Sequence, residues 1–214
     1  MRYLIVCGGK IDKEFGLNEI KTDGIDVIIA ADSGMDFLYE NGVTPDIIVG
    51  DFDSATTKAL EFFERKGQTE IHRLNPIKDD TDTEYAIRLA IREGARSIVL
   101  LGATGSRIDH VLGNISLLGI GLESGTDISI IDTNNRIRMA DKPVTIEKSA
   151  QYGRFVSLIA LTDDNEVSLK GFKYPVTDYS FDRFTSLGIS NEIVDDHALI
   201  DIHRGKFIII ESKD

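Results

Sequence analysis

The sequence predicts an α/β domain with a parallel sheet over residues 1–132, followed by an all-β sandwich domain over residues 133–214. The first prediction rests on the regular alternation of strand patterns and amphipathic helix patterns before Asp132, which is typical of Rossmann-like folds with helices over a parallel sheet. The second rests on the change after Asp132, where only short strand patterns and turn signals follow one another.

Most strands expected in the first domain are short apolar runs, as is usual for strands buried on both faces of a sheet. They are Arg2–Cys7, Asp26–Ala31, Ile47–Val49, Glu70–Leu74, Ser97–Leu101 and Asp127–Ile131. The helices expected between them carry apolar residues at helical spacing, so each can cover the sheet. They are Gly34–Glu40, Ala55–Lys66, Asp82–Glu93 and Ile108–Leu122. Ser54 is a favourable N-cap for the second of these helices.

The second domain is expected to contain strands and no convincing helix. The candidate strands are Ile137–Ala140, Val144–Glu147, Phe155–Leu161, Val167–Gly171, Ile189–Val194, Ala198–His203 and Lys206–Glu211. Arg204-Gly205 predicts a tight hairpin turn between the last two. A domain of about 80 residues has a small core, so we expect it to pack on the first domain, on a second subunit, or on both.

Charge and composition narrow the possible functions. The net charge of −12 argues against nucleic acid as a partner, because neutralising phosphates requires clustered Lys and Arg, and it favours a cationic ligand or a divalent metal. We find no apolar run long enough to span a bilayer and no signal peptide, so we expect no membrane partner. Cys7 is the only cysteine, which excludes an internal disulfide and fits a cytoplasmic protein.

Acidic residues follow two neighbouring strand patterns directly. Asp32 follows one of them, and Asp51 and Asp53 follow the next. Helix capping can explain Asp32, and it can explain either Asp53 or Ser54, but it does not explain Asp51 as well. Ligands of open α/β sheets bind at the carboxyl ends of the strands, and carboxylate oxygens there suit a Mg²⁺ ion that carries substrate phosphates.

A third polar cluster, residues 78–84, has a strong structural explanation. Thr81 and Glu84 have the spacing of a capping box, and an acid such as Asp82 suits the first turn of a helix. Lys78 is left as a possible phosphate contact.

A fourth cluster, residues 102–110, is a glycine-bearing turn between a strand and a helix. Such a turn lets backbone N–H groups approach phosphate oxygens, and Arg107 can bind those oxygens with its planar guanidinium. Asp109 and His110 can alternatively be an ordinary first-turn acid and a surface residue. Together, the clusters place five carboxylates at one rim of the predicted sheet, which indicates a site for a metal-bound nucleoside polyphosphate. These carboxylates are Asp32, Asp51, Asp53, Asp82 and Asp109.

Two stretches of the second domain allow two readings each. The polar run from Thr185 to Glu192 is either a hairpin loop or the lining of a ligand pocket. The stretch from Gly171 to Tyr174 offers either an aromatic platform or core side chains.

The motifs resemble those of thiamine pyrophosphokinases over nearly the whole chain. The matching segments are Ala31-Asp32-Ser33-Gly34, Pro45-Asp46 through Gly50-Asp51-Phe52-Asp53-Ser54, Asp80-Thr81-Asp82 and Gly102-x-x-Gly-x-Arg107-x-Asp109-His110, with looser matches at Gly171-Phe172-Lys173-Tyr174 and Ser190-Asn191-Glu192. The resemblance implies that ATP transfers pyrophosphate to the hydroxyl of thiamine, giving thiamine diphosphate and AMP. It also implies a homodimer in which thiamine is bound where the subunits meet, so that the active sites are shared.

The resemblance also implies roles for individual residues. The expected catalytic set is Asp32, Asp51, Asp53, Asp82, Arg107 and Asp109, in which Asp51, Asp53 and Asp82 would hold Mg²⁺. Either Asp32, near the reacting end of thiamine, or Asp51 would accept the hydroxyl proton. The expected ATP contacts are Lys78, Thr81, Gly102, Thr104, Gly105, Arg107, Asp109 and His110.

Thiamine would be bound by Asp32 together with residues of the second domain. Ser190 and Asn191 would contact its pyrimidine ring from the other subunit. Tyr174 stands where many relatives carry tryptophan, and this chain has no tryptophan. A tyrosine in this place can stack on the thiamine cation with a contact of about 0.5–2 kcal/mol.

Two other functions fit the same residues. One is a different Mg²⁺-dependent enzyme, either a nucleotidyltransferase or a phosphohydrolase. The other is a nucleotide sensor without catalytic activity, although the number of carboxylates exceeds what binding alone requires.

Overall fold

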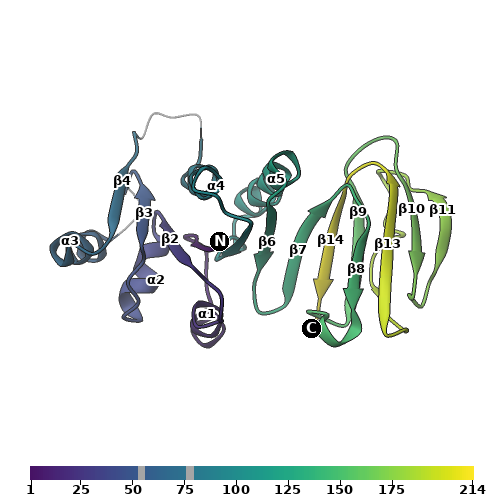
Figure 1. Cartoon of the computed structure of the whole chain (residues 1–214), viewed down its shortest axis with the longest axis horizontal. Coiled ribbons are helices and arrows are strands. Elements are labelled where there is room, and N and C mark those ends of the chain that lie inside the picture. Colours follow the sequence, from purple (N-terminus) through teal and green to yellow (C-terminus); the bar gives the residue numbers. More distant parts are fainter. Residues whose placement is uncertain (53–55, 76–79) are drawn as a thin grey trace. The chain divides into compact units, whose positions relative to one another are not determined.

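The computed structural model describes residues 1–52, 56–75 and 80–214, except for the side chain of Thr57. The chain divides into two compact units, Met1–Thr133 and Asn134–Asp214 (Figure 1). The first unit has a parallel sheet with helices and the second has antiparallel sheets, which confirms the predicted fold class. Among the described residues, no helix combines the length and the apolar character that crossing a membrane requires.

The sheet of the first unit has the strand order β6-β5-β1-β2-β3-β4, and neighbouring strands are parallel. The strands are β1 (Arg2–Val6), β2 (Val27–Ala31), β3 (Ile47–Gly50), β4 (Glu70–Arg73), β5 (Ser97–Leu101) and β6 (Asp127–Ile131). Buried Ile, Val, Leu and Ala side chains dominate the central strands because helices cover both faces of the sheet.

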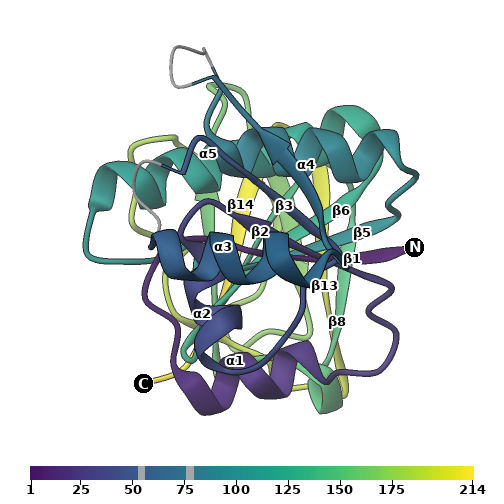
Figure 2. The ribbon, with the colours of Figure 1, turned by 90° about the vertical axis from the view of Figure 1, so that its left-hand side faces the viewer.

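The helices of the first unit are α1 (Lys13–Ile20), α2 (Gly34–Glu40), α3 (Thr57–Lys66), α4 (Asp82–Arg92) and α5 (Ile108–Ser124). The first three share an apolar core with one face of the sheet. The other two lie over the opposite face (Figures 1 and 2). The chain moves outward from β1 to β4, and α4 then returns it to β5 on the other side of β1. The carboxyl ends of the strands therefore form one crest, with a change of direction beside β1, where ligands of such sheets bind.

Two features of the first unit differ from the prediction. Ser54, the predicted N-cap of α3, lies outside the described residues, and the helix begins at Thr57 with Thr56 at the N-cap position. Helix α1 was not predicted. Its interior residue Gly16 disfavours a helix, yet a Cβ there would lie 2.7 Å from the ring of Phe37, so the close packing of α1 on α2 requires a glycine.

The second unit consists of two antiparallel sheets with the strand orders β12-β9-β14-β7 and β11-β10-β13-β8. Their bounds are β7 (Asn135–Ala140), β8 (Val144–Glu147), β9 (Phe155–Ala160), β10 (Glu166–Lys170), β11 (Val176–Ser180), β12 (Asn191–Glu192), β13 (His197–Arg204) and β14 (Phe207–Ser212), with a 3₁₀ turn at Lys148–Ala150. Apolar side chains from both sheets form one core. Phe207 on β14 pairs with Ala140 on β7 and Ala160 on β9, so a large side chain lies between small ones.

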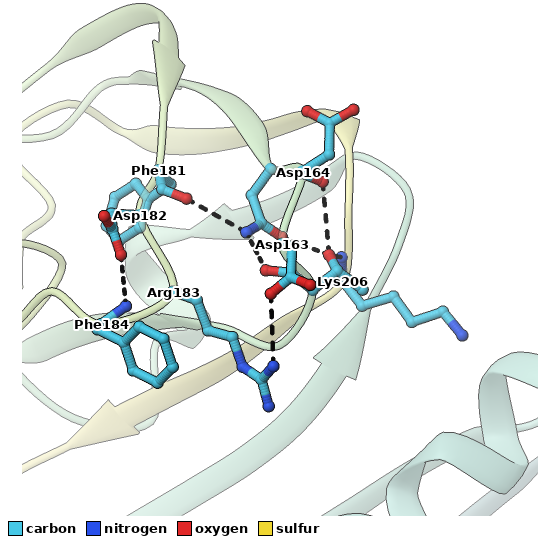
Figure 3. A network of polar contacts seen from close by, with 9 residues as sticks. Asp163, Asp164, Phe181, Asp182, Arg183, Phe184 and Lys206 are labelled. Atoms are coloured by element: carbon cyan, nitrogen blue, oxygen red, sulfur yellow. Dashed lines mark hydrogen bonds and ion pairs between the residues drawn. The ribbon is translucent and has the colours of Figure 1, made fainter.

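The β13–β14 hairpin turns at Gly205, as the Arg204-Gly205 pair predicts. Gly205 has a φ of +90°, and a Cβ there would lie 2.2 Å from Oδ1 of Asn165. Asn165 is buried, and its Nδ2 also donates to the backbone oxygen of Phe181 at 3.2 Å. One buried amide thus joins the β9–β10 turn to the segment after β11 and lies against the β13–β14 turn. In the same region, Arg183 forms an ion pair with Asp163 (Figure 3).

Strand β11 was not predicted. This strand lies at the edge of its sheet and its residues are mostly exposed, so they do not show the alternation of apolar and polar residues that identifies a half-buried strand. The predicted strand Ile189–Val194 is shorter in the structure, where β12 contains only Asn191 and Glu192.

Candidate active site

Three aspartates converge at the crest of the first unit. Asp32, Asp51 and Asp82 each offer a carboxylate oxygen, and these oxygens lie within 4.8 Å of one another. Asp32 follows β2, Asp51 follows β3, and Asp82 is the first residue of α4. All three side chains are half-buried. Three carboxylates so close together repel one another and favour binding of a divalent cation with hard oxygen ligands.

The register of the sheet explains why Asp32 and Asp51 meet. Ala31 on β2 pairs with Val49 on β3, so each aspartate leaves the sheet at nearly the same level. Asp32 has a left-handed φ of 48°, and its N–H donates to the backbone oxygen of Val49 at 2.8 Å. A Cβ on Gly50 would lie only 3.2 Å from Cα of Asp32, so the glycine allows the two turns to approach.

The N-terminus of α4 brings the third carboxylate. Thr81 is the N-cap residue, and its hydroxyl accepts a hydrogen bond from the N–H of Glu84 at 3.2 Å, which confirms one half of the predicted capping box. Glu84 itself accepts hydrogen bonds from Arg88 at 2.7 and 2.9 Å. Capping therefore accounts for Thr81, whereas Asp82 belongs to the acidic cluster.

The turn after β5 carries the other predicted ATP contacts. Gly102 has a left-handed φ of +73°, and a Cβ there would lie 2.6 Å from the backbone oxygen of Cys7. The hydroxyl of Thr104 donates to Asp132 at 2.9 Å, and Gly105 is exposed. This turn is therefore held by its close approach to the backbone of Cys7 and by Asp132, the residue that follows β6.

Arg107 and Asp109 form an exposed ion pair at the start of α5. Nη2 of Arg107 lies 2.6 Å from Oδ2 of Asp109. The hydrogen bond from Arg107 lowers the pKa of Asp109 to about 2, and the same contact raises the pKa of Arg107 above its ordinary value. His110 is exposed. Among the residues that the structure describes, the acidic cluster that can hold a metal does not include Asp109.

Two predicted site residues, Asp53 and Lys78, lie outside the described residues. Another part of the crest, which was not predicted, is the pair Gly8-Gly9 that follows β1. The N–H of Gly9 donates to the backbone oxygen of Gly102 at 2.9 Å, and a Cβ on Gly8 would lie 2.2 Å from the hydroxyl of Ser33. A glycine pair directly after an apolar strand was the signal that could have identified this turn.

In the second unit, Asn191 brings the predicted thiamine contacts together. Its Nδ2 donates to the backbone oxygen of Tyr174 at 2.9 Å, and its Oδ1 accepts from the N–H of Tyr174 at 3.1 Å. Asn191 is buried, whereas Ser190 and the ring of Tyr174 are exposed. Phe172 is a core residue. The geometry gives Asn191 a supporting position and leaves Ser190 and Tyr174 accessible to a ligand.

Comparisons with known proteins all identify the same family. The family model described as thiamin pyrophosphokinase, catalytic domain, matches residues 21–130, and the model described as thiamin pyrophosphokinase, vitamin B1 binding domain, matches residues 143–207. A thiamine pyrophosphokinase of Bacillus subtilis strain 168 is 34% identical over 195 residues, which cover 90% of this chain and 90% of that protein.

Solved structures agree with the sequence comparisons. A crystal structure of thiamine pyrophosphokinase from Bacillus subtilis superposes with a TM-score of 0.89 and 32% identity, covering 100% of both chains. A thiamin pyrophosphokinase structure from Geobacillus thermodenitrificans gives a TM-score of 0.86 and 29% identity, covering 100% of this chain and 98% of that one.

Proposed function

This chain belongs to the thiamine pyrophosphokinase family, and on that premise we propose that Asp32, Asp51 and Asp82 form the centre at which it transfers pyrophosphate from ATP to thiamine. The products are thiamine diphosphate and AMP. The convergence of these three carboxylates from separate segments is the observation that carries the proposal.

Mg²⁺ is the cofactor that fits the acidic cluster. It prefers oxygen ligands and is usually held by one or two carboxylates together with substrate phosphates. The oxygens of Asp32, Asp51 and Asp82 lie within 4.8 Å of one another, so two of these carboxylates can hold one ion while another accepts a proton. When bound, Mg²⁺ would neutralise charge on the triphosphate and align it. Asp53 remains a further predicted ligand.

The protein groups at the crest position the reactants and handle one proton. The hydroxyl of thiamine attacks the β-phosphorus of ATP, AMP leaves, and either Asp32 or Asp51 accepts the hydroxyl proton. The acidic cluster also attracts the positively charged thiazolium ring of thiamine. Reaction therefore depends mainly on alignment and on charge neutralisation.

In the turn after β5, Arg107 is the proposed phosphate contact. Asp109 orients its guanidinium through the 2.6 Å ion pair, and the same contact lowers the pKa of Asp109 to about 2. The glycine turn formed by residues 102–105 would offer backbone N–H groups to the same phosphates. Lys78, Thr81, Thr104 and His110 complete the proposed ATP contacts.

We assign thiamine recognition in the second unit to Tyr174 and Ser190, with Asn191 holding the backbone of Tyr174. This assignment is supported by the match of residues 143–207 to a vitamin B1 binding domain.

We further propose a homodimer with shared sites. Phe184, Leu187 and Ile189 form an apolar stretch in which these residues are 91%, 61% and 49% exposed, and such a stretch is typical of a surface that a second subunit covers. Sedimentation equilibrium on active enzyme tests this part, since a monomer with full activity would contradict shared sites.

The reaction itself is tested by incubating the protein with Mg²⁺, ATP and thiamine and separating the products. We expect AMP and thiamine diphosphate in equal amounts. Release of ADP, or turnover of ATP that does not depend on thiamine, would reject the proposed transfer.

A further inference from the structure

Phe52 directly follows Asp51 and adopts a left-handed backbone conformation with a φ of 64°. Residues other than glycine rarely adopt this conformation, and it persists only where surrounding contacts enforce it. The conformation of Phe52 sets the direction of the chain next to the Asp51 carboxylate. The contacts that hold Phe52 therefore bear on the acidic cluster.

The ring of Phe52 contacts two neighbouring strand ends. A Cβ built on Gly50 would lie 3.1 Å from the ring, so the glycine at the end of β3 allows the ring to approach the backbone. The guanidinium carbon of Arg73 lies 5.4 Å from the ring centroid, which is the geometry of a cation–π contact. The ring also packs against the apolar core of the first unit.

Arg73 is itself held in place. It is the last residue of β4 and is in register with Gly50 on β3. Its guanidinium forms an ion pair with Glu64 of α3. A strand end, a helix and the apolar core thus act together on one aromatic ring beside Asp51.

We propose that Phe52 and Arg73 are positioning residues for the metal site. Arg73 holds the ring of Phe52, and the ring fixes the backbone from which Asp51 reaches the acidic cluster. The inference rests on the proposed function, because it assumes that Asp32, Asp51 and Asp82 bind a divalent cation.

Binding of Mn²⁺ to the full chain, measured by electron paramagnetic resonance without nucleotide, reports on the metal site independently of turnover. We expect Arg73→Met to weaken Mn²⁺ binding by about twofold to fivefold, the size of an exposed cation–π contact. Phe52→Ala is expected to weaken it further because the ring itself is removed. Arg73→Lys keeps a cation near the ring and is expected to restore the affinity.

Arg92→Met is the matched control. The guanidinium carbon of Arg92 lies 5.6 Å from the ring centroid of Tyr85, a contact of the same kind, but Arg92 is at the C-terminal end of α4, away from Asp82. This variant is expected to bind Mn²⁺ like the unaltered protein. Melting temperatures identify any variant that does not fold, and Arg73→Met, a change at a half-exposed side chain, carries the test if Phe52→Ala fails to fold.

Asp51→Asn separates the possible failures. If this variant binds Mn²⁺ as well as the unaltered protein, the proposed metal site is wrong. If Asp51→Asn weakens binding while Phe52→Ala and Arg73→Met do not, only the positioning role is wrong. A loss of ATP affinity in Arg73→Met with unchanged Mn²⁺ affinity would make Arg73 a direct phosphate contact and would overturn the inference.

Discussion

The buried ion network of the second unit combines charges of both signs, whereas the acidic cluster of the first unit consists of carboxylates. Glu211 is completely buried, and its carboxylate accepts hydrogen bonds from Arg136 at 2.6 Å, Arg138 at 2.9 Å and the N–H of Tyr152 at 2.9 Å. The crest instead gathers the half-buried carboxylates of Asp32, Asp51 and Asp82, three charges of one sign.

This contrast provides a criterion that separates structural acids from functional ones. A buried carboxylate that is surrounded by cations of its own chain is part of the architecture, because removing one partner leaves an uncompensated charge. A cluster of like charges favours the binding of a cation, which is a property of functional sites. Stability should therefore depend on Glu211 and activity on the crest.

The largest effect is expected at the crest. Asp51→Asn removes one charged oxygen from the proposed metal site, and we expect thiamine diphosphate formation to fall by about a thousandfold or more, which corresponds to about 4 kcal/mol of transition-state stabilisation. The melting temperature should stay the same or rise, because the substitution reduces repulsion among the carboxylates. Product formation and thermal unfolding, measured on the same preparation, test both parts.

Asp46→Asn is the matched control for this prediction. Asp46 precedes β3, whereas Asp51 follows it, and Oδ2 of Asp46 accepts a hydrogen bond from the N–H of Ile28 at 2.8 Å. Its replacement should leave activity within about twofold, as expected of a change remote from the chemistry. If Asp46→Asn lost as much activity as Asp51→Asn, the loss in Asp51→Asn could not be assigned to the acidic cluster.

The second effect should fall on stability. Glu211→Gln leaves Arg136 and Arg138 without their shared counter-charge, and we expect a loss of about 3 kcal/mol in the free energy of unfolding. Urea denaturation measures this loss. Glu147→Gln, at an exposed position of the same unit, should change the free energy by less than about 0.5 kcal/mol. A Glu211→Gln variant as stable as Glu147→Gln would show that the network is dispensable.

The comparison between residues that affect stability and residues that affect activity also applies to the neighbours Asn191 and Ser190. Asn191→Ala removes the amide that bonds both backbone groups of Tyr174, so we expect a loss of about 1–3 kcal/mol in the free energy of unfolding. Ser190→Ala should leave stability unchanged and raise KM for thiamine. Urea denaturation and steady-state kinetics distinguish the two. A normal KM in Ser190→Ala would remove this hydroxyl from the proposed thiamine site.

The smallest effect concerns the exposed pair of Arg107 and Asp109. Because the pKa of Asp109 is lowered to about 2 in the folded protein, any stability that the pair adds is present at neutral pH and is lost as the pH falls through about 2. A carboxyl ¹³C titration should show this low midpoint, and Arg107→Met should raise it. Since the pair is exposed, Arg107→Met should hardly change the melting temperature. An unchanged midpoint would exclude the ion pair in solution.

Local sequence pattern was sufficient for most elements of the fold. Apolar runs and helical spacing predicted α2 with the bounds that the structure has, and α4 and α5 with nearly the same bounds. The pattern failed where tertiary contacts replace local signals. The interior glycine of α1 is needed for packing against Phe37, and the exposed edge strand β11 has no apolar face to reveal it.

Local periodicity and capping set strand ends and helix starts, so they were enough to predict that carboxylates follow the strands and begin the helices. The convergence of Asp32, Asp51 and Asp82 arises only in the folded chain. Their meeting depends on the order of the strands and on the path of α4 across the sheet, which bring residues far apart in the chain to one place. Spacing along a chain does not encode that order, since it is fixed by the packing of all the elements together.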